Sequence, residues 1–185
     1  MKVLFSTFVR PILEYAAPVW NPYNIGDIES IESVQKNATK LVPSLRSRHY
    51  RDRLQIIDLC TLEERWFRGD LIQYYKVHRG LNKLDWLNPN GRIASAHATG
   101  PASNTRGNSY RLALPLIRNC ARRDNFLSNR IVPTWNDLSD KIINAKNINV
   151  FKNKLDFYLK DNKRNLLQQG IDRCPRFASA EWHLM

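Results

Sequence analysis

The stretch TLEERWFRGDLIQYYKVHRG, residues 61–80, decides the fold because it carries the signals of one complete amphipathic helix. Thr61 followed by Glu64 forms a capping box, in which each side chain accepts a hydrogen bond from the other residue's backbone N–H. Gly80 suits the left-handed conformation that commonly follows a last helical turn. One face collects residues at three- and four-residue spacings: Leu62, Trp66, Gly69, Ile72 and Tyr75. We predict a helix from Thr61 to about His78, in which Gly69 lets a neighbouring helix approach closely.

Upstream of this helix the sequence also indicates helices. An apolar stripe at helical spacing predicts one helix, and its members are Ile28, Ile31, Val34, Ala38, Leu41 and Val42. Asn24 or Asp27 can cap its start, and Pro43 helps to end it. A short helix is predicted around residues 50–59. The apolar run of residues 1–9 is cut by Arg10 and Pro11, so it indicates the start of a buried helix rather than a signal peptide.

Downstream, residues 88–108 change character, because Gly, Pro, Asn and Ser make up 11 of these 21 residues. They are predicted to form a linker or long loop. Residues 110–114 alternate in polarity like one short strand. Helices are predicted near residues 123–132, ended or kinked by Pro133, and at 147–168.

The predicted fold is therefore mainly α, a helical domain with at most one short β element. Its expected parts are an N-terminal lobe (1–87), the linker (88–108), a C-terminal lobe (109–168) and a tail (169–185). Trp20, Trp66 and Trp135 are assigned to packing, because most tryptophans on apolar helical faces belong to a core.

Composition limits the possible functions. The 185 residues carry 29 Lys and Arg against 17 Asp and Glu, for a net charge of +12, which favours polyanionic partners. Three widely spaced cysteines argue against a disulfide framework and suit a reducing compartment. No Asp-Asp pair, Cys/His cluster or Gly-rich phosphate loop occurs in the sequence, so enzyme and metal constellations are not indicated.

The basic residues are concentrated in a few segments, and most of them are arginines. Because a guanidinium binds phosphate oxygens in pairs, the candidate nucleic-acid-binding residues are Arg46, Arg48, Arg51, Arg53, Arg65, Arg68, Arg118, Arg122, Arg123 and Arg130. The alternative is a solvated helix surface with local ion pairs, such as Arg65 with Asp70 or Glu64 with Arg68. Charge pattern alone leaves the two interpretations about even.

Five blocks of the sequence, in order, resemble non-LTR (LINE-type, jockey-like) retrotransposon reverse transcriptases. They are FVRPILEYAAPVWNPY (8–23), DIESIESVQKNATKLVP (27–43), LEERWFRGDL (62–71), RDNFLSNR with WNDL (123–130 and 135–138), and VFKNKLD (150–156). In that family this region follows the polymerase palm. The aspartates that hold catalytic Mg²⁺ lie upstream of the first block, which only seven residues precede here.

The resemblance implies a non-catalytic C-terminal region that helps to hold the RNA template and the DNA primer. The expected partners are RNA and RNA–DNA hybrid, bound with weak sequence preference, and the upstream polymerase core. No cofactor, membrane partner or polymerase activity is expected for this chain alone, and its location is expected to be intracellular, in nucleus or cytoplasm. Two alternatives stay open: a helical protein-interaction module derived from a broken element, and a decayed fragment without function.

Overall fold

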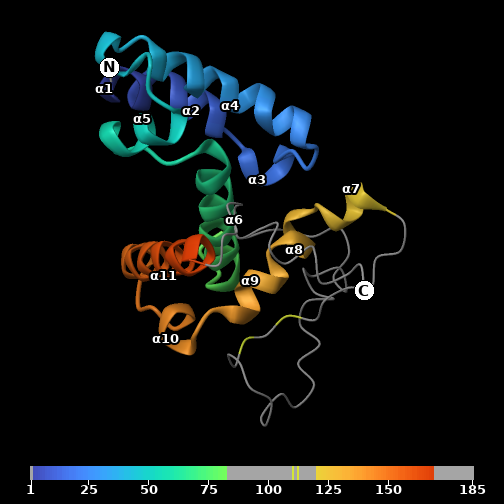
Figure 1. The fold of residues 1–185 in the computed structure, drawn as a ribbon. Helices are drawn as coiled ribbons and strands as arrows, with labels where there is room; N and C mark the ends of the chain where they lie inside the picture. Colours follow the sequence, from blue (N-terminus) through green and yellow to red (C-terminus); the bar gives the residue numbers. More distant parts are fainter. Residues whose placement is uncertain (1, 83–109, 111, 113–119, 169–185) are drawn as a thin grey trace. The chain divides into compact units, whose positions relative to one another are not determined.

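The computed structural model describes residues 2–82, 110, 112 and 120–168. All regular elements within these residues are helical (Figure 1), so the predicted mainly α fold is confirmed. The predicted linker and tail, and most of the predicted strand at 110–114, lie outside the described residues. The chain forms two compact units, Met1–Gly69 and Asp70–Met185. The boundary between them along the chain falls inside the helix Leu62–His78. The lobes that the sequence suggested stay a prediction.

The first unit begins with four short helical segments. They are α1 (Lys2–Leu4), the π-helical turn η1 (Phe5–Val9), α2 (Arg10–Glu14) and α3 (Ala17–Trp20). The expectation of a buried helix start is wrong for most of this run. Phe5 is 3% exposed, but Val3 and Phe8 are 75% and 67% exposed. The apolar residues of this run are distributed around the helical axis. Because a helix can turn only one face toward its own unit, the residues on the other face stay exposed.

Helix α4 (Ile25–Lys40) confirms the second predicted helix, and it ends before Pro43 as expected. The predicted apolar stripe faces the core only in part, since Ile28 is buried but Val34 and Leu41 are exposed. The buried positions are Ile28, Glu32, Gln35 and Thr39. The buried face is therefore largely polar, which is stable only because each of these polar side chains finds a hydrogen-bond partner.

The 3₁₀ turn η2 (Pro43–Leu45) and helix α5 (Tyr50–Ile57) follow, and α5 confirms the predicted short helix. Helix α6 (Leu62–His78) confirms the central prediction. Thr61 Oγ1 accepts from the Glu64 backbone N–H at 3.2 Å, and Gly80 has a φ of +65°. The predicted close approach at Gly69 is wrong, because a Cβ built there meets no described atom within 4 Å.

The second unit comprises the end of α6 and five further described helices (Figure 1). They are α7 (Ala121–Asp124), α8 (Leu127–Arg130), α9 (Val132–Asp137), α10 (Asp140–Ile143) and α11 (Ile148–Gln168). The predicted helix at 123–132 is thus divided into α7 and α8. It ends before Pro133, and Pro133 lies in the first turn of α9, where its missing N–H breaks no helical hydrogen bond.

Tryptophans anchor both cores, as predicted. Trp66 is 1% exposed and Trp135 is 0% exposed. Trp20 packs edge-on against Trp66 with their ring centroids 5.4 Å apart, which holds the Pro18–Tyr23 segment to the first unit. In the second unit the ring of Tyr74 lies 4.6 Å from that of Trp135. Large aromatic surfaces therefore dominate the packing of each unit.

Candidate nucleic-acid interface

In the first unit, exposed arginines lie on the segment between α4 and α5 and at the start of α5. Arg46 and Arg48 are exposed in the turn that follows η2, and Arg51 is exposed on the first turn of α5. We call residues 46–51 the first basic segment. These arginines are exposed, and an exposed basic side chain can exchange water and counterions for phosphate.

Arg53, two residues further on, lies in a different environment, because only 4% of it is exposed. Its Nε donates to Thr39 Oγ1 at 3.1 Å and its Nη1 donates to the Arg48 carbonyl at 3.0 Å. Its guanidinium also lies over the ring of Tyr50, 5.5 Å from the centroid. The guanidinium of Arg53 is therefore engaged by acceptors inside the unit, so Arg53 is not positioned to bind phosphate.

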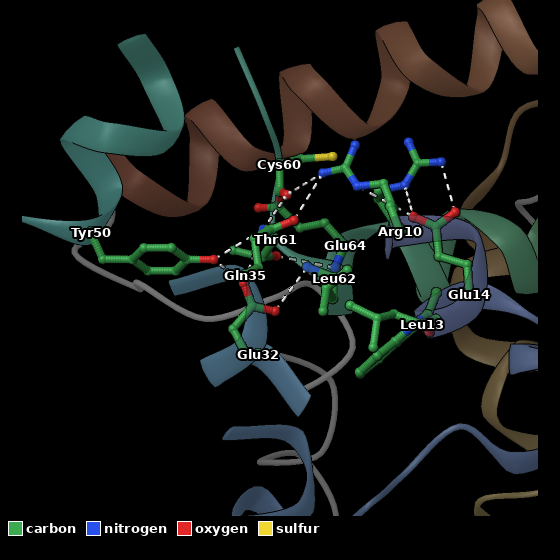
Figure 2. Close-up of polar contacts among 12 residues, drawn as sticks. Arg10, Leu13, Glu14, Glu32, Gln35, Tyr50, Cys60, Thr61, Leu62 and Glu64 are labelled. Carbon is green, nitrogen blue, oxygen red and sulfur yellow. Dashed lines mark hydrogen bonds and ion pairs between the residues drawn. The ribbon is translucent and has the colours of Figure 1, made fainter. Parts of the chain in front are cut away.

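A buried polar network lies next to the first basic segment (Figure 2). Glu32 on α4 is 7% exposed and accepts three hydrogen bonds. Its Oε2 accepts from the Leu62 backbone N–H at 2.9 Å, while its Oε1 accepts from the Tyr50 hydroxyl and, at 3.3 Å, from Gln35 Nε2. Glu32 therefore caps the first N–H of α6 and ties α5 to α4 through one carboxylate.

Burial governs the ionisation of this network. Desolvation raises the pKa of the Glu32 carboxyl, although the hydrogen bonds from Tyr50 and Leu62 oppose the shift. Desolvation and the neighbouring Glu32 raise the pKa of the Tyr50 hydroxyl, so Tyr50 stays protonated and donates. Burial likewise raises the pKa of the Cys60 thiol despite nearby Arg65 and Arg10. These shifts favour the protonated forms of the Tyr50 hydroxyl and the Cys60 thiol, which are weaker nucleophiles than a phenolate and a thiolate.

Arg65 on α6 is also held within the unit. Its Nη2 donates to Glu14 Oε2 at 2.8 Å, and its Nε donates to Glu14 Oε1. This bond raises the pKa of Arg65. The alternative pair Arg65 with Asp70 is therefore wrong, because Arg65 binds an acid 51 residues earlier in the chain. Arg68, on the same helix, is half-buried.

In the second unit, Arg122 and Arg123 are exposed on α7, and we call residues 122–123 the second basic segment. Arg130 lies on α8, and the side chains of Arg130 and Asp70 are 6% and 1% exposed. Arg130 Nε and Nη2 donate to the two carboxylate oxygens of Asp70, each at 2.8 Å. Arg130 Nη1 donates to the Asn125 carbonyl at 2.7 Å. Arg118 lies outside the described residues.

The ten candidate arginines therefore divide by environment. Exposed side chains belong to Arg46, Arg48, Arg51, Arg122 and Arg123. Intramolecular acceptors hold Arg53, Arg65 and Arg130.

Sequence reasoning missed which acid partners each of two of these arginines: Glu14 binds Arg65, and Asp70 binds Arg130. It also missed Glu32, although the spacing of Ile28, Glu32, Gln35 and Thr39 is itself helical. That spacing indicates one buried helical face. It was overlooked because polar residues are expected to face water.

The part of the chain that the structure describes lacks both a membrane-spanning helix and a cluster of metal ligands. No helix there is both long enough and apolar enough to cross a membrane. No three His, Cys, Asp or Glu side chains gather there in a group that could hold a metal ion. Comparison of the chain with protein-family models, with curated proteins and with solved structures finds no match.

Proposed function

We propose that this chain is a non-catalytic region that binds the phosphate backbone of RNA and of RNA–DNA hybrids. This is the role that its resemblance to the C-terminal region of non-LTR reverse transcriptases implies. The observation that carries the proposal is the exposure of the arginines in both basic segments. Arg46 and Arg48 in the first, and Arg122 and Arg123 in the second, extend into solvent while neighbouring arginines are buried.

The chemistry of such binding is electrostatic. Each guanidinium that neutralises a phosphate releases condensed counterions, so affinity falls steeply as salt rises. Backbone contacts position a duplex without reading its bases. The proposed site therefore binds A-form hybrid and RNA with weak sequence preference, and polymerisation belongs to an upstream core that holds the catalytic Mg²⁺.

The test is a salt titration of binding to a fluorescent RNA–DNA hybrid of mixed sequence, measured by anisotropy with the full chain. Each phosphate contact contributes about 0.7 to 0.9 to the slope of log K against log salt. The double variants Arg46→Ala with Arg48→Ala, and Arg122→Ala with Arg123→Ala, should each reduce the slope by about 1.5.

The matched control removes two exposed lysines that lie outside both basic segments, Lys146 and Lys160. The variant Lys146→Ala with Lys160→Ala changes the net charge by the same amount and should leave the slope nearly unchanged. Equal losses in the control and in the arginine variants would mean that the chain responds only to net charge. Failure of the wild-type chain to bind at low salt would refute the proposal outright.

A second candidate function is a protein-interaction module, and the exposed apolar residues of the first unit favour it. Val3, Leu4, Phe8 and Ile12 are between 64% and 75% exposed on α1, η1 and α2. Contiguous exposed apolar side chains commonly mark a protein contact. They are compatible with the proposed upstream polymerase core as the partner. Salt-insensitive association with a partner protein, without hybrid binding, would favour this candidate over nucleic-acid binding.

A further inference from the structure

The two basic segments share one structural device. In each unit a buried arginine donates its Nη1 to the carbonyl of the residue five positions earlier. Arg53 donates to the Arg48 carbonyl at 3.0 Å, and Arg130 donates to the Asn125 carbonyl at 2.7 Å. The Arg48 carbonyl lies within the first basic segment, and the Asn125 carbonyl lies at the C-terminal end of α7, the helix that carries the second. The buried guanidinium groups therefore hold the backbone of the segments that carry the exposed ones.

The other N–H groups of each of these guanidinium groups donate to a helix of the same unit. Arg53 is fixed to α4 through Thr39 Oγ1 at 3.1 Å and through the carbonyl of Lys36 at 3.5 Å. Arg130 is fixed to α6 through both oxygens of Asp70. A planar guanidinium with five donors can reach two acceptors at fixed angles, which a lysine ammonium cannot reproduce.

A second contact reinforces the arrangement in the second unit. Asn129 Nδ2 donates to the Arg123 carbonyl at 2.6 Å, so two side chains of α8 hold two carbonyls at the end of α7. Helix α7 has only four residues and buries none of them. Such a short, exposed helix has little stability of its own, so these contacts from α8 determine its position.

We propose that Arg53 and Arg130 are positioning residues for phosphate binding, not phosphate ligands. Each fixes the backbone from which exposed arginines extend, Arg46 and Arg48 in one unit and Arg122 and Arg123 in the other. Fixing these side chains in advance lowers the entropy lost on binding, which is the general benefit of preorganisation. This inference rests on the proposed function, and it reassigns two of the ten candidate arginines.

Arg130→Lys is the first test variant in the full chain. Lysine keeps a positive charge beside Asp70 but cannot also reach the Asn125 carbonyl in the geometry of the fork. The second variant, Asp70→Leu with Arg130→Met, replaces the whole buried pair with apolar side chains. Such replacements often preserve a fold, because no buried charge is left without a partner. Arg53→Lys makes the same test in the first unit.

Two measurements are made on each variant. One is amide hydrogen exchange, of residues 120–126 for the Arg130 variants and of residues 46–51 for Arg53→Lys. The other is the salt slope of hybrid binding. We expect faster exchange in that segment with unchanged exchange in α11. We also expect a reduced salt slope and weaker binding, in the same direction as Arg122→Ala with Arg123→Ala. A purely structural role would leave the salt slope unchanged in a variant that still folds.

The outcomes separate the two proposals. If Arg122→Ala with Arg123→Ala reduces the slope while Arg130→Lys and the apolar double variant do not, the positioning role is refuted and the binding proposal stands. Unchanged exchange in residues 120–126 for both variants would also refute the positioning role. If the wild-type chain does not bind the hybrid at low salt, the proposed function fails and the positioning role fails with it.

Discussion

Replacing Asp70 with asparagine should strongly destabilise the second unit. The Asp70 and Arg130 side chains are 1% and 6% exposed, and two hydrogen bonds of 2.8 Å join them. Asparagine removes the negative charge beside the guanidinium of Arg130. A buried cation is then left with neutral acceptors, among them the Asn125 carbonyl. Removing one partner of a buried ion pair costs about 3 to 5 kcal/mol.

We expect the lower end of that range, about 3 kcal/mol, because Arg130 keeps one carbonyl partner. That free energy corresponds to roughly a hundredfold change in the folding equilibrium constant. The assay is urea denaturation followed by circular dichroism, with hydrogen exchange of α8 and α9 to report on the second unit alone. With a denaturant dependence of about 1 to 3 kcal/mol per molar urea, the midpoint should fall by about 1 to 3 M.

The matched control is Asp161→Asn, the same chemical change at an exposed position on α11. It should alter the free energy of unfolding by less than about 0.5 kcal/mol. If Asp70→Asn had an effect as small as this control, the pair would be solvated rather than buried. The reasoning would also fail if the apolar double variant, Asp70→Leu with Arg130→Met, lost as much stability as Asp70→Asn.

Three further predictions concern α6 and its cap. Burial raises the pKa of Glu32 in the folded state above the usual 4.5. The contribution of the protonated Glu32 to stability is therefore fully present below pH 4.5 and is lost as the pH rises through the raised pKa. The free energy of unfolding of the wild type, relative to Glu32→Gln, should therefore fall over this window in urea titrations at several pH values. A difference that does not vary with pH would contradict the burial of Glu32. Gly69→Ala should raise the free energy of unfolding by about 0.5 to 1 kcal/mol, because alanine favours a helix interior and its Cβ meets no described atom within 4 Å. A lower free energy of unfolding in this variant would contradict the open space around Gly69. Thr61→Ala should lower the free energy of unfolding by about 1 kcal/mol by removing the acceptor for the Glu64 N–H, whereas Thr61→Ser, which keeps the hydroxyl, should lower it by less.

The sequence alone was sufficient wherever the deciding interactions are local. The bounds of α6 follow from the cap at Thr61, from Gly80, and from the three- and four-residue spacing of the apolar residues between them. Each of these signals acts over about one helical turn. The start of a new helix at Val132 follows from proline geometry, because Pro133 is tolerated in a first helical turn but not in a helix interior. The burial of Trp66 and Trp135 follows from the large apolar surface of an indole. None of these inferences requires knowing which distant segment lies nearby.

The tertiary structure decided which way each helix faces and which arginines reach solvent. Helix α4 buries Glu32, Gln35 and Thr39 instead of the more apolar Val34 and Leu41, because Tyr50, the Leu62 N–H and Arg53 supply partners from later in the chain. Arg51 is exposed and Arg53 is buried, although they are two residues apart and chemically identical. Composition could locate the basic segments. It could not separate exposed from buried arginines, because the burial of a charged side chain depends on acceptors that only folding brings together.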